Sequence, residues 1–487
     1  MTQSHPQPQP QPRRRPARFS RPRTPHPPGR RDGPGRPPVD DPARQAALDT
    51  LREVRARDAY ANLLLPQLLR ERRITGRDAA LATELAYGAC RSIGLLDVIL
   101  DACTDRPLAK VEPEVLDVLR LGTYQLLRTR IPNHAAVAST VDLVRAEQGS
   151  RVSGFVNAVL RKVSELDEAA WLDKLAPDPA QDPIGNVAMR EAHPRWVARA
   201  FADALGDTGA ELARALAADN ERPAVHLVAR PGEVSADELA AMTGGEVAPY
   251  SPYGVRLAAG AGDPAGLEPV RERLAAVQDE GSQLCAVALT RPEVAGTDAR
   301  WLDLCSGPGG KSALLAALLG ISGGTLDAVE KAPHRARLVE QSTGGLPVTV
   351  HVGDGRQPAA LGLADGTFDR VLVDAPCTGL GSLRRRPESR WRRQPSDVAE
   401  LAKLQRELLG TAVALTRPGG VIGYVVCTPH LSETIGVVAD VVRRTGVTPL
   451  DARAYFPGMP DLGAGPYVQL WPHRHGTDAM FCALLRR

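Results

Sequence analysis

The stretch Asp303-Leu-Cys-Ser-Gly-Pro-Gly-Gly-Lys-Ser312 decides the fold class of this 487-residue chain. An apolar segment at 300–304 comes before the glycines and is typical of a β-strand, and a segment at 313–319 follows them with the spacing of a helix. Glycines between a strand and a helix allow the backbone to approach a ligand closely. The stretch therefore predicts an α/β domain that binds a nucleotide-like ligand at this turn.

The same alternation of strand, turn and helix continues along the chain from about residue 276. It predicts a mostly parallel, doubly wound sheet of Rossmann-like type with helices on both faces. Ligands of such sheets bind at the carboxyl ends of the strands, so we expect the site in the loops that follow the strands. The predicted strands are at 300–304, 325–329, 348–352, 370–373 and 421–426.

Four segments precede this α/β domain, which we assign to residues 276–487. Residues 1–40 contain twelve prolines and nine arginines against two aspartates, which predicts a disordered basic tail. The tail is either an RNA tether without sequence preference or a solubilising segment. Helical periodicity predicts an all-α domain at 41–165 and a helical connector at 166–222. Two short strands and a helix predict a small α+β module at 223–275.

The composition excludes several classes of protein. No stretch approaches the roughly 20 apolar residues that cross a bilayer. The N-terminus lacks the apolar segment of a secretory signal, so we expect a cytoplasmic protein without membrane contact. Seven widely spread cysteines without a CxxC pair argue against a disulfide framework and against a metal site. Without the tail the net charge changes from +3 to about −4, so attraction of nucleic acid to the remainder must come from local patches.

Two kinds of ligand compete for the glycine turn. A Walker A loop needs a glycine where this chain has Cys305, so ATP is the weaker alternative. Methyltransferases use such a turn for the amino-acid end of S-adenosylmethionine and place an acid after the next strand for the ribose hydroxyls. Glu330 stands there, and Asp354 follows the third strand, where it could accept a hydrogen bond from the adenine amino group. Either acid alone fits a helix cap or a solvated loop, but the combination with the turn favours S-adenosylmethionine.

Two cysteines follow the fourth and fifth predicted strands, in Asp374-Ala-Pro-Cys377 and in Cys427-Thr-Pro-His430. Both are expected at the edge of the sheet that holds the cofactor. A cysteine thiolate that adds to carbon 6 of a cytosine makes carbon 5 nucleophilic enough to accept a methyl group. Asp374 could stabilise the charge that develops at N3 of the ring. The other cysteines are interpreted as inert small apolar residues: Cys90, Cys103, Cys285, Cys305 and Cys482.

Five motifs carry a resemblance to a known family: VQDEGSQ at 277–283, DLCSGPGGK at 303–311, VDAPCTG at 373–379, WPHRHGTD at 471–478 and FVNAVLR at 155–161. On these motifs the chain resembles the bacterial 16S ribosomal RNA cytosine-C5 methyltransferases of the RsmB (Sun) type, within the wider Nop/Sun family. The last motif is similar to the NusB-like, RNA-binding helical domain that this subfamily carries in front. The resemblance covers essentially the whole chain after the tail.

The resemblance implies an enzyme that forms 5-methylcytosine in small-subunit ribosomal RNA with S-adenosylmethionine as cofactor. Cys427 is then the nucleophile that bonds to cytosine C6, Cys377 assists release of the methylated RNA, and Asp374 activates the base. In this chain Glu433-Thr434 replaces the family's usual Glu-Asn pair. We expect a monomer without a metal. The predicted cofactor pocket consists of Leu304, Cys305, Ser306, Gly307, Pro308, Gly309, Gly310, Lys311, Glu330, Arg335, Asp354 and Asp374.

A basic run beside the catalytic aspartate loop is the predicted RNA contact. Guanidinium groups and a tryptophan suit phosphate binding and base stacking, and the alternative is a solvated charged surface. The predicted RNA-binding residues are Arg384, Arg385, Arg386, Arg390, Trp391 and Arg392.

Two other functions remain open at the level of sequence. A NusB-like domain would also suit an RNA-binding factor of the antitermination type without catalysis. The joint presence of Cys377, Cys427 and the cofactor residues argues against that alternative. An enzyme of the same chemistry could instead act on transfer RNA or DNA, but the helical front domain favours ribosomal RNA by resemblance.

Overall fold

The computed structural model describes residues 41–148 and 150–487, which lie within one compact unit that spans 39–487. The predicted basic tail falls outside the described residues. Within the described part, no helix is both long and apolar enough to cross a membrane. Because 39–487 is one unit, the domain boundaries at 165, 222 and 275 remain predictions.

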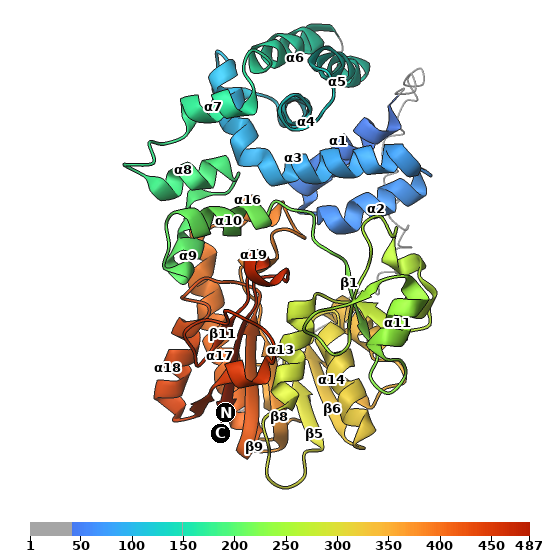
Figure 1. Ribbon diagram of the computed structural model, residues 1–487, viewed down its shortest axis with the longest axis vertical. Helices are drawn as coiled ribbons and strands as arrows, with labels where there is room; N and C mark the ends of the chain where they lie inside the picture. The colour runs from blue at the N-terminus through green and yellow to red at the C-terminus, as the bar shows by residue number, and fades with distance from the viewer. Residues whose placement is uncertain (1–40, 149) are drawn as a thin grey trace, which may run out of the picture. The chain divides into compact units, whose positions relative to one another are not determined.

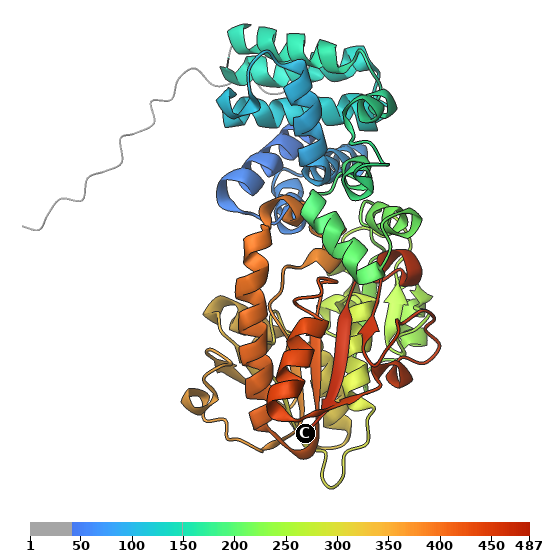
Figure 2. The same ribbon diagram turned by 90° about the vertical axis from the view of Figure 1, so that its left-hand side faces the viewer.

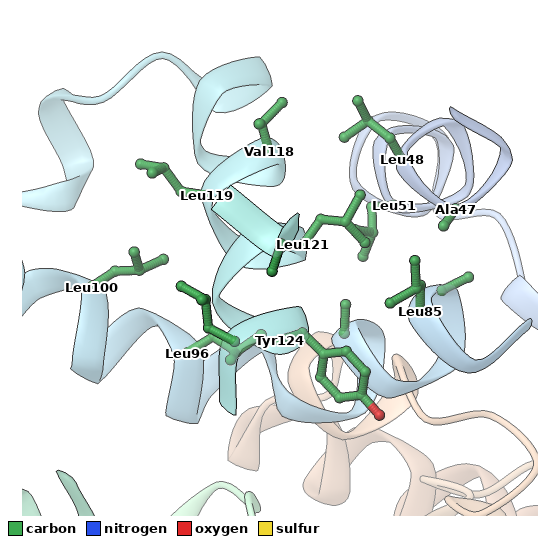
Figure 3. Close-up of a cluster of buried hydrophobic side chains, with 14 of the residues drawn as sticks. Ala47, Leu48, Leu51, Leu85, Leu96, Leu100, Val118, Leu119, Leu121 and Tyr124 are labelled. Carbon is green, nitrogen blue, oxygen red and sulfur yellow. The ribbon is translucent and has the colours of Figure 1, made fainter. Parts of the chain in front are cut away.

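An all-α region comes first, as predicted (Figure 1). The first helix begins where the Asp41 carboxylate accepts a hydrogen bond from the Arg44 amide at 2.9 Å and Pro42 takes the first helical position. The 28-residue helix α3 packs against α1 and α4, and side chains such as Leu51, Leu85 and Leu121 meet between them (Figure 3). The helices are α1 (Pro42–Arg57), α2 (Ala61–Glu71), α3 (Gly76–Cys103), η1 (Leu108–Lys110), α4 (Pro113–Arg128), α5 (Asn133–Gln148), α6 (Ser150–Val163) and α7 (Glu168–Leu175).

A helical connector and a small α+β module follow. The connector contains α8 (Pro183–Arg190), α9 (Arg195–Leu205) and α10 (Ala210–Ala218). The module is an antiparallel sheet in the order β2-β3-β1-β4, and its last strand extends past the predicted boundary at 275. Its elements are β1 (His226–Ala229), α11 (Ala236–Thr243), β2 (Glu246–Val247), β3 (Gly254–Arg256), η2 (Pro264–Gly266), α12 (Glu268–Arg271) and β4 (Ala275–Val277).

The third region contains the predicted doubly wound sheet. Its strand order is β10-β12-β9-β8-β5-β6-β7, in which the five strands from β9 to β7 are parallel and the C-terminal strands β10, β11 and β12 are antiparallel. The strands are β5 (Arg300–Asp303), β6 (Thr325–Glu330), β7 (Val348–Val352), β8 (Phe368–Asp374), β9 (Thr416–Val426), β10 (Thr448–Leu450), β11 (Val468–Gln469) and β12 (Phe481–Arg486). The helices are α13 (Glu280–Thr290), α14 (Gly310–Ile321), α15 (Pro333–Ser342), η3 (Pro358–Leu361), η4 (Leu380–Ser382), α16 (Ser389–Arg392), α17 (Pro395–Leu415), α18 (Ile435–Thr445), η5 (Ala452–Tyr455) and α19 (Pro472–His475).

Both faces of this sheet are covered by helices (Figures 1 and 2). Neighbouring residues of one strand alternate between two cores, since Trp301 packs with α13 and α14 whereas Leu302 packs with α17 and α18. This double burial explains why the parallel strands are continuous apolar runs in the sequence. The carboxyl ends of β5, β6, β7, β8 and β9 therefore meet at one edge, which carries the candidate site.

Candidate active site

The glycine turn joins β5 to α14. The buried Asp303 carboxylate holds the turn from within, because it accepts hydrogen bonds from Ser312 Oγ at 2.6 Å and from the Cys305 amide at 3.3 Å. Burial raises the pKa of Asp303 to about 7. Gly309 has a φ of +95°, and a β-carbon there would lie 2.0 Å from Ser342 Oγ. Glycine is thus required by both conformation and space.

The two predicted acids lie at the next two strand ends. Glu330 is the last residue of β6 and is buried, with Oε1 accepting from the Ala332 amide at 2.8 Å and Oε2 3.1 Å from Arg335 Nη2. Asp354 follows β7 and lies 2.7 Å from Arg356 and 3.1 Å from Lys331. The hydrogen bonds donated by Arg356 hold the pKa of Asp354 well below its usual range, so this carboxylate is ionised.

A cavity of about 1000 Å³ opens at this edge of the sheet. It brings together the glycine turn, both acids and both cysteine loops. The predicted site residues that line it are Leu304, Cys305, Gly307, Pro308, Glu330, Arg335, Asp354, Asp374, Cys377, Arg386 and Cys427.

Four residues of the predicted cofactor set stand behind the cavity wall instead of lining it. Ser306 is buried and its amide donates to the Val329 carbonyl at 2.9 Å, so it connects the turn to β6. Gly309 and Gly310 begin α14. The ammonium group of the buried Lys311 donates to Asp374 Oδ2 at 2.8 Å, and this carboxylate raises the pKa of Lys311 although burial opposes the charge. Lys311 therefore positions Asp374 from behind.

The two cysteine sulfurs lie 3.4 Å apart, at the ends of the adjacent parallel strands β8 and β9. The hydrogen bond from the Cys377 thiol lowers the pKa of Cys427, and the positive charges of Lys311 and Arg386 act in the same direction. The same hydrogen bond, together with burial, raises the pKa of Cys377 well above its ordinary value. Burial also raises the pKa of Cys305, which agrees with its interpretation as an inert thiol. The thiolate is thus favoured at Cys427.

A buried carboxylate that the sequence reasoning missed, Glu433, joins the two cysteine loops. Its side chain is 0% exposed and accepts from the Thr378 amide at 2.8 Å, from Thr378 Oγ at 2.5 Å and from Thr428 Oγ at 3.1 Å. Gln405 of α17 donates to the same carboxylate at 3.0 Å. In the sequence Glu433 drew attention only because Thr434 follows it in place of asparagine. Nothing in the sequence indicated that Glu433, in the loop after β9, contacts the Cys377 loop after β8.

The structure corrects part of the predicted RNA-binding run. Arg384 and Arg385 form ion pairs with Asp279 and Asp478, and all four side chains are largely buried. These acids belong to the motifs at 277–283 and 471–478, so the arginines connect three segments that are distant in sequence. Their guanidinium groups are engaged within the protein, and the prediction that they contact RNA is wrong for this arrangement.

The short helix α16 is also a junction, contrary to the prediction. Arg390 is 0% exposed and donates to the carbonyl of Ala192 at 3.1 Å and to Asn220 Oδ1 at 2.8 Å, and burial lowers its pKa to about 9. Trp391 Nε1 donates to the Arg91 carbonyl of α3 at 3.0 Å. Arg392 donates to the backbone carbonyls of Val54 in α1 and of Asp58 and Ala59 in the loop that follows. These three residues bind the helical regions to the sheet region, and of the six predicted RNA-binding residues only Arg386 is an exposed lining residue of the cavity.

Fold and site together define a methyltransferase domain of the α/β class joined to a NusB-like helical domain. Residues 292–486 match the family described as 16S rRNA methyltransferase RsmB/F, and residues 41–165 match the NusB family. The ribosomal RNA small subunit methyltransferase B of Klebsiella pneumoniae subsp. pneumoniae is 31% identical over 449 residues, which cover 91% of this chain and 97% of that protein. The chain belongs to the RsmB/F family of 16S rRNA methyltransferases.

Two further similarities extend over nearly the whole chain. A protein of Mycobacterium tuberculosis (strain H37Rv) that bears the name of a methyltransferase is 60% identical over 456 residues, which cover 93% of this chain and 98% of that protein. The crystal structure of PH0851 has the same fold, with a TM-score of 0.76 and 21% identity over 93% of this chain and 100% of that chain. The predictions of the fold class and of an S-adenosylmethionine-dependent rRNA methyltransferase are confirmed, and a non-catalytic RNA-binding factor is excluded.

Proposed function

We propose that this enzyme methylates carbon 5 of a cytosine in 16S ribosomal RNA, with Cys427 as covalent nucleophile. The observation that carries the proposal is the pair of sulfurs 3.4 Å apart, in one cavity with the glycine turn. An addition at carbon 6 of a pyrimidine gives two neighbouring cysteines distinct tasks, one to form the bond and one to assist its release. An oxygen or exocyclic nitrogen acceptor would need neither.

The residues at the cavity fit S-adenosylmethionine. Bound there, S-adenosylmethionine supplies an electrophilic methyl group on a sulfonium sulfur. The buried Glu330 carboxylate suits two hydroxyl donors of a ribose, and the ionised Asp354 suits an amino donor. The turn offers backbone groups without side chains at Gly307. The residues that would hold the cofactor are Leu304, Cys305, Gly307, Pro308, Glu330, Arg335 and Asp354.

Cys427 starts the reaction. Its thiolate forms the bond from Sγ to carbon 6 of the cytosine, and the electron pair of the double bond between carbons 5 and 6 moves into the ring. Asp374 in its acid form donates its proton to N3 and so neutralises the charge that develops there, and the Lys311 ammonium stabilises the carboxylate that remains. Carbon 5 is then nucleophilic enough to accept the methyl group, whose bond to the sulfonium sulfur would break as the new bond forms.

Cys377 completes the reaction. The proton on carbon 5 must leave before the product can form, and the electrons of that bond restore the ring double bond as the bond from Cys427 to carbon 6 breaks. Cys377 lies beside Cys427 and is the group available to assist this release. Its raised pKa keeps it a thiol, which can donate a hydrogen bond to the Cys427 sulfur as that sulfur leaves as a thiolate, while the carbon-5 proton passes to water.

The substrate assignment rests on family membership and on the NusB-like domain, which we propose binds the RNA. We retain Arg386 as the RNA contact among the six predicted residues. The enzyme is proposed to act in the cytoplasm as a monomer, and its organisation is proposed to follow the boundaries 41–165, 166–222, 223–275 and 276–487.

Bisulfite sequencing of ribosomal RNA tests the function directly. In a deletion strain, one cytosine of 16S rRNA should lose its protection from conversion, and the wild-type gene should restore it whereas Cys427→Ala should not. Unchanged protection in 16S rRNA, or a loss confined to transfer RNA, would contradict the proposal.

A further inference from the structure

The helical domain contributes one residue to the catalytic cavity. Tyr60, the residue that begins α2, lines the cavity together with Asp374, Cys377 and Cys427, and its side chain is 41% exposed. Among the described residues that line this cavity, Tyr60 is the one aromatic side chain and the one residue that precedes the sheet region.

The ring of Tyr60 holds an arginine. The guanidinium of Arg386 lies 5.1 Å from the ring centroid, a distance at which a cation is attracted to the π face. Arg386 is exposed, and within residues 41–148 and 150–487 no carboxylate forms an ion pair with it. Its neighbours in the basic run are all engaged with acids or carbonyls. Arg386 therefore presents a free guanidinium to the cavity and carries the charge that phosphate binding requires.

The position of Tyr60 is fixed by the junction at α16. Arg392 donates to the carbonyls of Val54 at 3.1 Å and of Asp58 at 2.8 Å, and to that of Ala59 immediately before Tyr60. The guanidinium of Arg392 also lies 5.6 Å from the centroid of the tyrosine ring. The preceding residue, Trp391, packs against α3 so closely that a β-carbon on Gly94 would lie 2.1 Å from its ring. The loop before Tyr60 is thus bound to the same segment that carries Arg386.

We infer that Tyr60 is a positioning residue that holds Arg386 where its guanidinium binds a phosphate of the RNA strand whose cytosine enters the cavity. This inference rests on the proposed function. A cytosine must leave its stack to reach Cys427, and a fixed charge on the adjacent phosphate keeps the extruded nucleotide in place. The helical domain then takes part in substrate binding at the catalytic cavity itself, through one ring.

Steady-state kinetics with an unmethylated 16S rRNA transcript tests the inference. Tyr60→Ala should raise the KM for RNA about two- to fivefold, the range of an exposed cation–π contact, with kcat and the affinity for S-adenosylmethionine unchanged. Tyr60→Phe keeps the ring and should restore the wild-type KM. Arg386→Ala should raise KM at least as much, and Tyr60→Ala in that background should add nothing, because the two side chains act as one unit.

A salt series and a matched control separate this role from a structural one. Arg386→Ala should lower the slope of log affinity against log salt by about 0.7, the value for one phosphate contact on a single strand. Leu63→Ala, at a 67% exposed position of α2 outside the cavity, should leave KM unchanged. Additive effects of Tyr60→Ala and Arg386→Ala, or a KM in Tyr60→Ala equal to wild type, would overturn the inference. RNA binding is measured by filter retention without cofactor, so a failure of methylation itself would contradict only the proposed function.

Discussion

The loops after β8 and β9 are alike in sequence and unlike in surroundings. Each places a cysteine beside a proline or threonine at the same edge of the sheet, and their sulfurs lie 3.4 Å apart. The Cys427 sulfur has the negative charge of Asp374 and the positive charges of Lys311 and Arg386 near it, whereas Cys377 has the negative charge of Glu433 near it. The strand end alone does not decide which sulfur attacks. The hydrogen bond between the two sulfurs contributes most to the difference between their pKa values, because it lowers the pKa of Cys427 and raises that of Cys377.

Glu433 connects the two loops, and its negative charge helps to raise the pKa of Cys377. Its carboxylate accepts hydrogen bonds from Thr378 of one loop and Thr428 of the other. The two thiols are therefore held at a fixed separation but in different electrostatic surroundings. This arrangement favours a thiolate at Cys427 and a protonated thiol at Cys377.

Removing the nucleophile should have the largest effect. Cys427→Ala should lower the rate of methyl transfer by about ten-thousand-fold or more, because no other side chain can form the bond to carbon 6. Isothermal calorimetry should find the affinity for S-adenosylmethionine nearly unchanged. Cys103→Ala, in the helical core, serves as the control and should remain active. Normal turnover by Cys427→Ala would mean that Cys427 is not the nucleophile.

Removing the second cysteine should stop the reaction at a later point. Cys377→Ser should slow turnover about a hundredfold, since the adduct forms but its release is no longer assisted. A slow-migrating band of enzyme bound to 16S rRNA should accumulate on a denaturing gel. The double variant with Cys427→Ala should show no such band. A Cys377→Ser enzyme that turns over freely without a band would remove the release role.

Loosening the connection between the loops should have an intermediate effect. Glu433→Gln keeps the size of the side chain but replaces one acceptor oxygen, which two donors share, by an NH2 group, and each buried donor left unsatisfied costs about 1–3 kcal/mol. We expect kcat to fall about tenfold and the thermal midpoint to fall by a few degrees. Glu340→Gln, on the exposed face of α15, is the matched control. If Glu433→Gln keeps full activity, the separation of the sulfurs does not depend on this carboxylate.

The smallest expected effect is a shift in pH dependence. The hydrogen bond from Cys377 is the largest cause of the lowered pKa of Cys427, so Cys377→Ala should raise that pKa. Because only the thiolate attacks, the single-turnover rate of adduct formation rises with pH, and the midpoint of the rise should move to higher pH in Cys377→Ala. A rapid-quench pH profile measures both midpoints. Coinciding profiles would show that Cys377 does not tune its neighbour.

Much of the fold could be predicted from sequence because its signals are local. Strands β7 and β6 are apolar runs that end at turn residues. The strand predicted at 348–352 agrees with Val348–Val352, and the one predicted at 325–329 agrees with Thr325–Glu330. The antiparallel strands β10 and β12 and the long helix α17 were not predicted. Their positions depend on contacts in the folded chain, since β10 pairs with β12, β12 pairs with β9, and α17 packs against β8.

The site was predictable where it consists of strand ends and was not where it depends on distant partners. The positions of Asp374, Cys377 and Cys427 followed from the rule for parallel sheets. An arginine in a basic run looks the same in sequence whether it faces solvent or a buried acid. The partner of Arg384, Asp279, lies 105 residues away, and the role of Arg390 depends on Ala192, 198 residues away. Only the fold reveals these contacts.

The identity of the sulfur bonded to RNA is the most direct test. The Cys377→Ser enzyme would be incubated with unmethylated 16S rRNA and S-adenosylmethionine, digested with nuclease and protease, and its peptides sequenced by mass spectrometry. We expect a single modified peptide, with a methylated cytidine nucleotide attached at Cys427. Attachment at Cys305 or another cysteine, or methylated RNA without any attached peptide, would contradict the account.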